Sequence, residues 1–497
     1  MTDDGGAGRR GAPGAGATST SKGALPSPTL AEALLPLVTM LLLFAGGTFL
    51  VGSSTELLVV ILLLSAAVAG AVARRHGVGW DAIQAATGER IASVLPGLLI
   101  LLAIGLLIAT WIASGTVPFL VYWGVRLVDP RYLVVTAFLA TAVMSLVTGT
   151  SWGSAGTIGV ALMGMAAALE VPLAVTAGAV VSGAYFGDKL SPLSDTTNCS
   201  AIGAGAPLYT HICHMLWTAV PSTVAAVLVY TLVADPGAAG NGLPEGARRL
   251  LADLESVYTL GWVVLLPPVI VIWGILRRTP PALALALSSL VAGIIAVGVQ
   301  GFGISETVAA LGGGFRLEFL ASAGVDPASV GPAFATLVER GGLYPMANTL
   351  VVILSAFLLA GGMHASGSLD LLIRRMLDSV RSVFGLIAAT MASGATMIAL
   401  TSHGLVTALV IGELFQGAYD EQGMARENLS RSLEDSVTVT EPIMPWTVSA
   451  VFMATTLGVS TVSYLPWAVF CYGGPVFSLL WAALYRRTGV GLTRAVA

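Results

Sequence analysis

The chain has 497 residues, of which 56% are apolar and only 10% are charged. Soluble globular proteins carry about 25% charged residues, so this chain lacks the polar groups needed to cover its surface in water. Its small net charge of −4 argues against nucleic acid as a partner. These values predict an all-α polytopic membrane protein with roughly 10–14 transmembrane helices.

Five segments follow one another along the chain. Residues 1–28 are rich in Gly, Ala, Ser, Thr and Pro, a composition typical of a disordered tail. Long apolar runs fill residues 29–234, which we predict to be a first transmembrane repeat. The polar stretch 235–257 is expected to be an extracytoplasmic connector. Residues 258–486 are the predicted second transmembrane repeat, and residues 487–497 a cytoplasmic tail.

Basic residues gather beside particular apolar runs. They are Arg9, Arg10, Lys22, Arg74, Arg75, Arg277, Arg278, Arg374, Arg375, Arg381, Arg486, Arg487 and Arg494. Short loops rich in Lys and Arg remain on the cytoplasmic side of membranes. We therefore expect both termini in the cytoplasm and an even number of full spans.

Three short motifs recur in the same order in both halves. ASGT at 113–116 returns as ASGS at an offset of 252, and TSWG at 150–153 returns as TSHG at an offset of 251. LSDT at 193–196 returns as LEDS at an offset of 240, which implies 11 residues lost before it. The first pair is expected on opposite sides of the membrane. The pattern thus predicts two inverted repeats, with a binding site near the membrane midplane.

Two polar segments interrupt apolar sequence, GDKLSPLSDTTN at 187–198 and NLSRSLEDSVTVTEPIMPW at 428–446. Both contain prolines, which end helices. Non-helical backbone at membrane depth persists only inside protein or beside water, so these segments predict broken or re-entrant helices. Carboxylates, hydroxyls and freed carbonyls together suit a hard cation such as Na⁺, and a carboxylate can exchange that cation for a proton. The alternative is that the segments are solvated loops between helices.

These segments and the repeat motifs supply the candidate site residues. The ion- or substrate-binding candidates are Thr150, Ser151, Asp195, Thr196, Thr197, Asn198, Thr401, Ser402, Glu434, Asp435, Ser436 and Thr438. The proton-coupling candidates are Asp188, Asp195, Asp435 and His403, and Na⁺ is hypothesised to bind at Asp195 and Asp435.

Each candidate also has a simpler interpretation. The Ser and Thr hydroxyls can bond to carbonyls of their own helices. His403 is as easily a packing residue as a proton relay. Lys189 can serve only to neutralise Asp188.

The phosphate-binding pattern GxxxxGK[ST] is absent from the sequence. ATP-driven transport by this chain alone is therefore not expected, and coupling to an ion gradient is the economical alternative. We expect a transporter and not an enzyme, with no cofactor and with Na⁺ and H⁺ as transported or coupling ions.

Four segments resemble the NhaC-type Na⁺/H⁺ antiporter family of the ion-transporter superfamily. They are GDKLSPLSDTTN, LYTHICHMLWTAVPS at 208–222, SRSLEDSVTVTEPIMPW at 430–446 and YLPWAVFCYGGPVFSLLWA at 464–482. The resemblance implies a bacterial inner-membrane antiporter with inverted repeats, paired re-entrant hairpins, an elevator-like movement and commonly a homodimer. One departure is Val437, where the family pattern leads us to expect glycine.

The sequence therefore predicts a secondary active transporter, with Na⁺/H⁺ antiport as the leading function. The alternative is Na⁺- or H⁺-coupled exchange of small organic anions, of the malate/lactate type, or of amino acids. A more distant alternative is an ion channel, since broken helices can also line pores.

Overall fold

The computed structural model describes residues 28–52, 54–233, 243–402 and 404–495. Within these ranges the chain is almost entirely helical. Eight helices are long and apolar enough to cross a membrane, and two sharply bent helix pairs raise the number to ten. The predicted all-α polytopic membrane fold is confirmed. All but one residue of the predicted tail, and His403, lie outside the described residues.

The helices of the first half are α1 (Leu30–Val51), α2 (Thr55–Arg75), α3 (Trp80–Ala113), α4 (Thr116–Leu127), η1 (Pro130–Tyr132), α5 (Leu133–Thr148), α6 (Ser151–Ser154), the π-helix η2 (Ala155–Gly159), α7 (Val160–Ala168), α8 (Leu173–Leu190), α9 (Asp195–Ala204) and α10 (Leu208–Val233). α11 (Glu245–Val257) is an amphipathic helix whose leucines pack inward, and it occupies most of the predicted connector.

The second half contains η4 (Trp262–Leu265), α12 (Leu266–Leu276), α13 (Pro281–Gly298), α14 (Ile304–Gly313), η5 (Leu317–Ala323), η6 (Pro327–Ser329), α15 (Pro332–Val338), α16 (Leu343–Ala365), α17 (Ser368–Asp378), α18 (Val383–Thr401), α19 (Gly404–Glu421), α20 (Arg426–Leu433), the π-helix η7 (Glu434–Thr438), η8 (Glu441–Ile443), α21 (Val448–Leu457), α22 (Thr461–Tyr464), η9 (Leu465–Trp467) and α23 (Val469–Thr488).

Glycines bring α5 and α8 into backbone contact. A Cβ added at Gly183 would lie 2.2 Å from the carbonyl oxygen of Phe138, and one added at Gly187 would lie 2.4 Å from that of Ala142. The Ser145 hydroxyl donates to the Ala184 carbonyl across the same interface at 2.6 Å. Small residues allow this close approach of helices in membranes, where dispersion contacts replace the hydrophobic effect as the main attraction.

Helix boundaries in the second half repeat those of the first half at an offset of 253 residues. α9 and α21 are both ten residues long, and each ends at a glycine with positive φ, Gly205 and Gly458. α5 and α18 also end 253 residues apart, each followed by a left-handed residue, Gly149 at φ 68° and Ser402 at φ 53°. The recurrence extends from the end of α5 to the start of α10.

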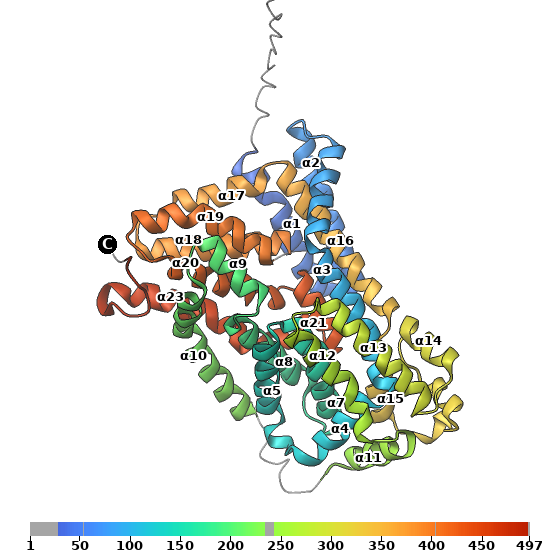
Figure 1. Cartoon of the computed structure of the whole chain (residues 1–497). Helices are drawn as coiled ribbons and strands as arrows, with labels where there is room; N and C mark the ends of the chain where they lie inside the picture. The colour runs from blue at the N-terminus through green and yellow to red at the C-terminus, as the bar shows by residue number, and fades with distance from the viewer. Residues whose placement is uncertain (1–27, 53, 234–242, 403, 496–497) are drawn as a thin grey trace, which may run out of the picture.

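The first repeated motif keeps its predicted offset. Ser114 and Thr116 share a 2.8 Å hydrogen bond where α3 turns into α4, and Ser366 and Ser368 share one of equal length where α16 turns into α17. In Figure 1 these equivalent turns lead in different directions, because α4 lies at the lower end of the molecule and α17 at the upper end.

The other two motif pairings are corrected. The structure aligns Thr148, and not Thr150, with Thr401, because each of these residues closes its helix and hydrogen-bonds to a hydroxyl six residues further on. At the third motif the constant offset places Asp195 opposite Val448, since these residues begin the equivalent helices α9 and α21. The expected loss of 11 residues did not occur: matching short Ser/Asp strings misaligned Asp195 with Asp435.

Candidate functional site

The first predicted helix break lies between α8 and α9. α8 ends at Leu190, the backbone is non-helical through Ser194, and the Ser194 hydroxyl caps α9 by accepting the Thr197 N–H. The Thr197 hydroxyl donates back across the break to the carbonyls of Asp188 and Lys189 at 3.1 and 3.0 Å. The break is thus a hydrogen-bonded structure that fixes the last turn of α8 relative to the start of α9.

The equivalent break in the second half joins η8 to α21. Residues 444–447 are non-helical, and the Thr447 hydroxyl caps α21 by accepting the Ala450 N–H. The Tyr464 hydroxyl donates to the Pro442 carbonyl at 2.6 Å, which satisfies an acceptor that this broken helix leaves open. Glu441 lies just before this break, at the position equivalent to Asp188.

Two hairpins bring their tips to the two breaks. The first hairpin is α5 followed by α6, and its tip places Ser151 so that the hydroxyl donates to Asp188 Oδ2 at 2.8 Å. The second hairpin is α18 followed by α19. A Cβ added at Gly404, where α19 begins, would lie 2.9 Å from Glu441 Oε2. Each carboxylate therefore faces the tip of the hairpin from its own half.

A cavity of about 710 Å³ opens between these elements, and both carboxylates line it. Six of the predicted site residues are among its lining: Thr150, Ser151, Asp188, Asp195, Thr196 and Ser402. Trp152 also lines the cavity; its ring stacks on Phe452 with centroids 4.4 Å apart, and its Nε1–H donates to the Ser449 hydroxyl at 3.3 Å. This contact joins the first hairpin tip to α21 of the second half.

Asp435 lies in a different place, inside a buried ion pair. Its Oδ1 accepts from Lys189 and from the Thr218 hydroxyl, the latter at 3.1 Å, and both charged side chains are 0% exposed. Arg431 approaches the second carboxylate oxygen at 3.9 Å. Lys189 therefore pairs with Asp435 and not, as one interpretation had it, with its neighbour Asp188. The ion pair connects α8 of the first half to η7 of the second.

The remaining predicted residues are outside the cavity lining and have other partners. Ser436 donates to the carbonyl of Ser432 at 2.6 Å, as the simpler reading of such hydroxyls proposed, and Glu434 accepts from Ser200 at 2.8 Å. Thr401 is paired with a hydroxyl of its own hairpin, while Asn198 donates to two carbonyls of the α8–α9 break. Thr438 is buried within η7.

The sequence analysis did not select Glu441, Ser449 or Trp152. The signal that identifies Glu441 is the constant offset of 253, which aligns it with Asp188 once helix ends and not residue letters are matched. Ser449 and Trp152 meet only through the tertiary contact between α6 and α21, which no local pattern reveals.

Comparisons with known proteins agree with this architecture. Residues 183–484 match the model of the Na⁺/H⁺ antiporter family. An uncharacterised Na⁺/H⁺ antiporter of Haemophilus influenzae is 42% identical over 468 residues, which is 94% of this chain and 97% of that protein. The Na⁺/H⁺ antiporter NhaC of Alkalihalophilus pseudofirmus is 34% identical over 86% of this chain and 90% of its own length.

A relative with a different named cargo also matches. The malate-2H⁺/Na⁺-lactate antiporter of Bacillus subtilis is 31% identical over 79% of this chain and 82% of its own length. The relatives are transporters and not enzymes, and exchange of solutes is common to their names. The chain is therefore a multi-pass secondary antiporter, and it belongs to the Na⁺/H⁺ antiporter family.

Proposed function

We propose that this protein exchanges Na⁺ for H⁺ and that the exchange takes place in the cavity bounded by Asp188 and Glu441. The observation that carries the proposal is that these two carboxylates, each from a broken helix, line one cavity and lie at equivalent positions of the two halves. Among the described residues neither carboxylate has an ion-pair partner. A cation or a proton is needed to balance their charge.

The ligands around Asp188 suit a hard cation. The Ser151 hydroxyl is already 2.8 Å from the carboxylate, and Thr150 and Asp195 add further oxygen donors at the cavity wall. Alkali and alkaline-earth cations bind oxygen donors of this kind, and helix ends at a break contribute partial charges. Na⁺ and a proton compete for the same carboxylates, so release of one permits binding of the other.

This proposal assigns the predicted residues different roles. Asp195 stays a cation ligand candidate, because it lines the cavity at the start of α9. Asp435 becomes a structural counter-charge for Lys189, since a carboxylate already neutralised by a buried ammonium has less to gain from binding Na⁺.

Proteoliposomes with an imposed pH gradient test the assignment. Asp188→Asn and Glu441→Gln should each lower Na⁺-driven proton movement about 100-fold, because loss of one charged ligand costs about 2–3 kcal/mol. The matched control is Asp420→Asn, which removes a partly exposed carboxylate paired with Arg426 and should leave transport unchanged. Wild-type rates in both cavity variants would refute the site.

We also propose that the two halves are inverted repeats, with both termini in the cytoplasm of a bacterial inner membrane. The recurrence of helix ends at 253 residues and the opposite positions of α4 and α17 support the inversion (Figure 1). Cysteines introduced at Arg131 and Arg381 should react with a membrane-impermeant reagent from opposite sides. Labelling from one side would refute the inversion. The homodimer stays a prediction from family resemblance, which cross-linking in native membranes would test.

Exchange of a small organic anion is the second candidate function. Arg278 lines the same cavity, and its guanidinium could hold a carboxylate beside a bound cation. The cavity is also much larger than a bare cation requires, and one relative is named for malate and lactate. Uptake of labelled malate, lactate or basic amino acids that Arg278→Gln abolishes would favour this function. Proton movement driven by Na⁺ alone, unchanged in Arg278→Gln, would favour cation exchange.

A further inference from the structure

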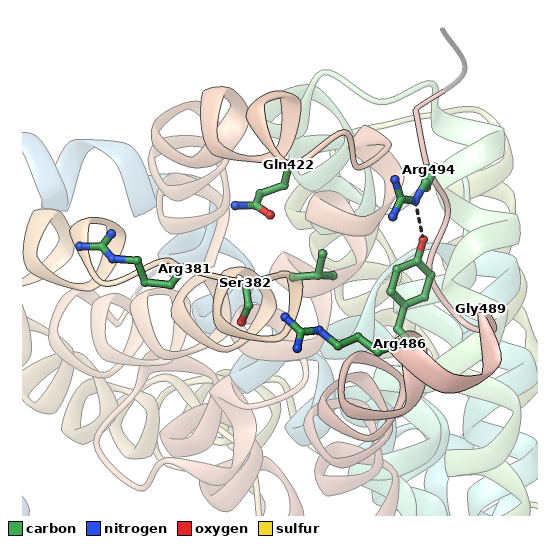
Figure 2. A pocket seen from close by; sticks show the side chains of 8 residues that line it. Arg381, Ser382, Gln422, Arg486, Gly489 and Arg494 are labelled. Atoms are coloured by element: carbon green, nitrogen blue, oxygen red, sulfur yellow. Dashed lines mark hydrogen bonds between the residues drawn. The ribbon is translucent and has the colours of Figure 1, made fainter.

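A second pocket lies away from the cavity, beside the C-terminal end of the chain (Figure 2). Its volume is about 520 Å³, and it is lined by Arg381, Ser382, Val383, Gln422, Tyr485, Arg486, Gly489 and Arg494. Figure 2 shows that these residues come from the start of α18 and from the end of α23 with the segment after it, together with Gln422 at the end of α19. The lining holds three arginines and no carboxylate.

The arginines are exposed, and their positive charge is not neutralised by ion pairs in the described part of the chain. Arg494 Nε donates to the Tyr485 hydroxyl at 3.2 Å, and Arg381 bonds to the carbonyls of Asp378 and Val380. These contacts hold the side chains in place but leave further N–H donors on each guanidinium, which has five. The nearby carboxylate of Asp420 already binds Arg426.

The start of α18 adds a second attraction for anions. Ser382 caps this 19-residue helix by accepting the Gly385 N–H at 3.1 Å. Among the described residues the same hydroxyl donates no hydrogen bond, so its hydrogen can be given to a ligand oxygen. The positive end of the helix dipole and its unpaired N–H groups also favour a phosphate. Arginine clusters and a helix N-terminus thus meet in one pocket.

The position of the pocket indicates where the phosphate comes from. α18 is a membrane-spanning helix, and the pocket lies at its first residue. This depth corresponds to the headgroup layer. Basic pockets beside membrane helices on the cytoplasmic side bind the headgroups of anionic lipids, and Tyr and Arg are common residues at this interface.

We propose that this pocket binds the phosphate headgroup of an anionic phospholipid from the adjacent leaflet. The ligand is recognised through Arg381, Arg486 and Arg494 together with Ser382 at the start of α18. The site is distinct from the transport cavity, with which it shares no lining residue. Lipid bound here would connect the start of α18, and so the second hairpin, to the end of α23.

The test compares lipid binding by the intact protein and by an arginine-depleted variant. The protein is purified in detergent, phosphatidylglycerol or phosphatidylcholine is added, and bound lipid is counted by native mass spectrometry. Wild type should retain phosphatidylglycerol in preference to phosphatidylcholine. The triple variant Arg381→Gln, Arg486→Gln, Arg494→Gln should bind phosphatidylglycerol about tenfold more weakly, since each lost charged hydrogen bond is worth roughly 1.5–3 kcal/mol before water compensates.

The charge-matched control is Arg74→Gln, Arg277→Gln, Arg374→Gln, which removes three exposed arginines outside the pocket. It should bind phosphatidylglycerol as wild type does. Equal loss in the control and the pocket variant, or no loss in either, would overturn the proposal. An additional arm adds inorganic phosphate: displacement of phosphatidylglycerol only at high salt-like concentrations supports a lipid site. Tight phosphate binding without preference between the two lipids would overturn the lipid source. None of these readouts depends on Na⁺/H⁺ exchange.

Discussion

Asp188 and Lys189 are consecutive residues of α8, yet their side chains enter two polar regions that differ in access and in charge balance. Asp188 lines the cavity and is bound by a neutral hydroxyl, that of Ser151. Lys189 is fully buried and is paired with Asp435. A carboxylate without a counter-charge beside an open cavity can exchange ions, whereas a closed ion pair chiefly holds elements together. The comparison separates a transport site from a structural joint.

The largest expected effect comes from breaking the joint. Lys189→Ala leaves Asp435 buried opposite only the more distant Arg431, and loss of one partner of a buried pair costs about 3–5 kcal/mol. We expect a sharply lower thermal midpoint of the purified protein and a low yield. The double variant Lys189→Met, Asp435→Leu removes both charges and should recover most of that loss. A stable Lys189→Ala protein would contradict a structural role for the pair.

A smaller effect is expected on the other side of α8. Ser151→Ala removes the hydroxyl that donates to Asp188, and a hydrogen bond to a charged group contributes about 1.5 kcal/mol or more. The half-saturating Na⁺ concentration in proteoliposomes should rise about tenfold while the thermal midpoint stays near that of wild type. Ser355→Ala, whose hydroxyl bonds only within its own helix, is the control. A fall in stability without a change in Na⁺ dependence would place Ser151 with the structural residues.

The smallest effect is expected at the contact between the halves. Trp152→Phe keeps an aromatic ring over Phe452 but removes the hydrogen bond to Ser449, worth about 1 kcal/mol. Transport should slow by a fewfold with Na⁺ dependence retained. Trp152→Ala, which also removes the stacked ring, should be worse than Trp152→Phe. Equal rates in Trp152→Phe and wild type would show that the stacked rings alone join the two halves.

The sequence predicted the membrane fold, the two helix breaks and six residues of the cavity lining. These features depend on local chemistry: apolar runs of sufficient length, prolines that end helices, and polar groups clustered where hydropathy expects lipid. The prediction of Asp435 as a cation ligand failed to anticipate its partner, because Lys189 is 246 residues away and meets it only through tertiary packing. Charge compensation of this kind is invisible in a linear pattern.

The register of the repeat shows a second limit of sequence reading. Asp195 and Asp435 sit in similar strings of letters, and this similarity suggested equivalence. The structure relates residues by backbone role instead, through helix ends, caps and left-handed residues such as Gly149 and Ser402. Ser402 adopts φ 53° without being glycine, so the residue type alone does not signal the turn. Matching such backbone roles makes Glu441 the counterpart of Asp188.

The glycine contact between α5 and α8 has a mechanical consequence. At Gly183 and Gly187 the two helices touch backbone to backbone, and a single added methyl group would collide with a carbonyl. Neither helix can slide along the other without that collision, so Ser151 at the hairpin tip and Asp188 on α8 travel as one rigid body. The hinge that opens the cavity first to one side of the membrane and then to the other must therefore lie elsewhere. The ion rides with its ligands, and the opposite wall sets which side it meets.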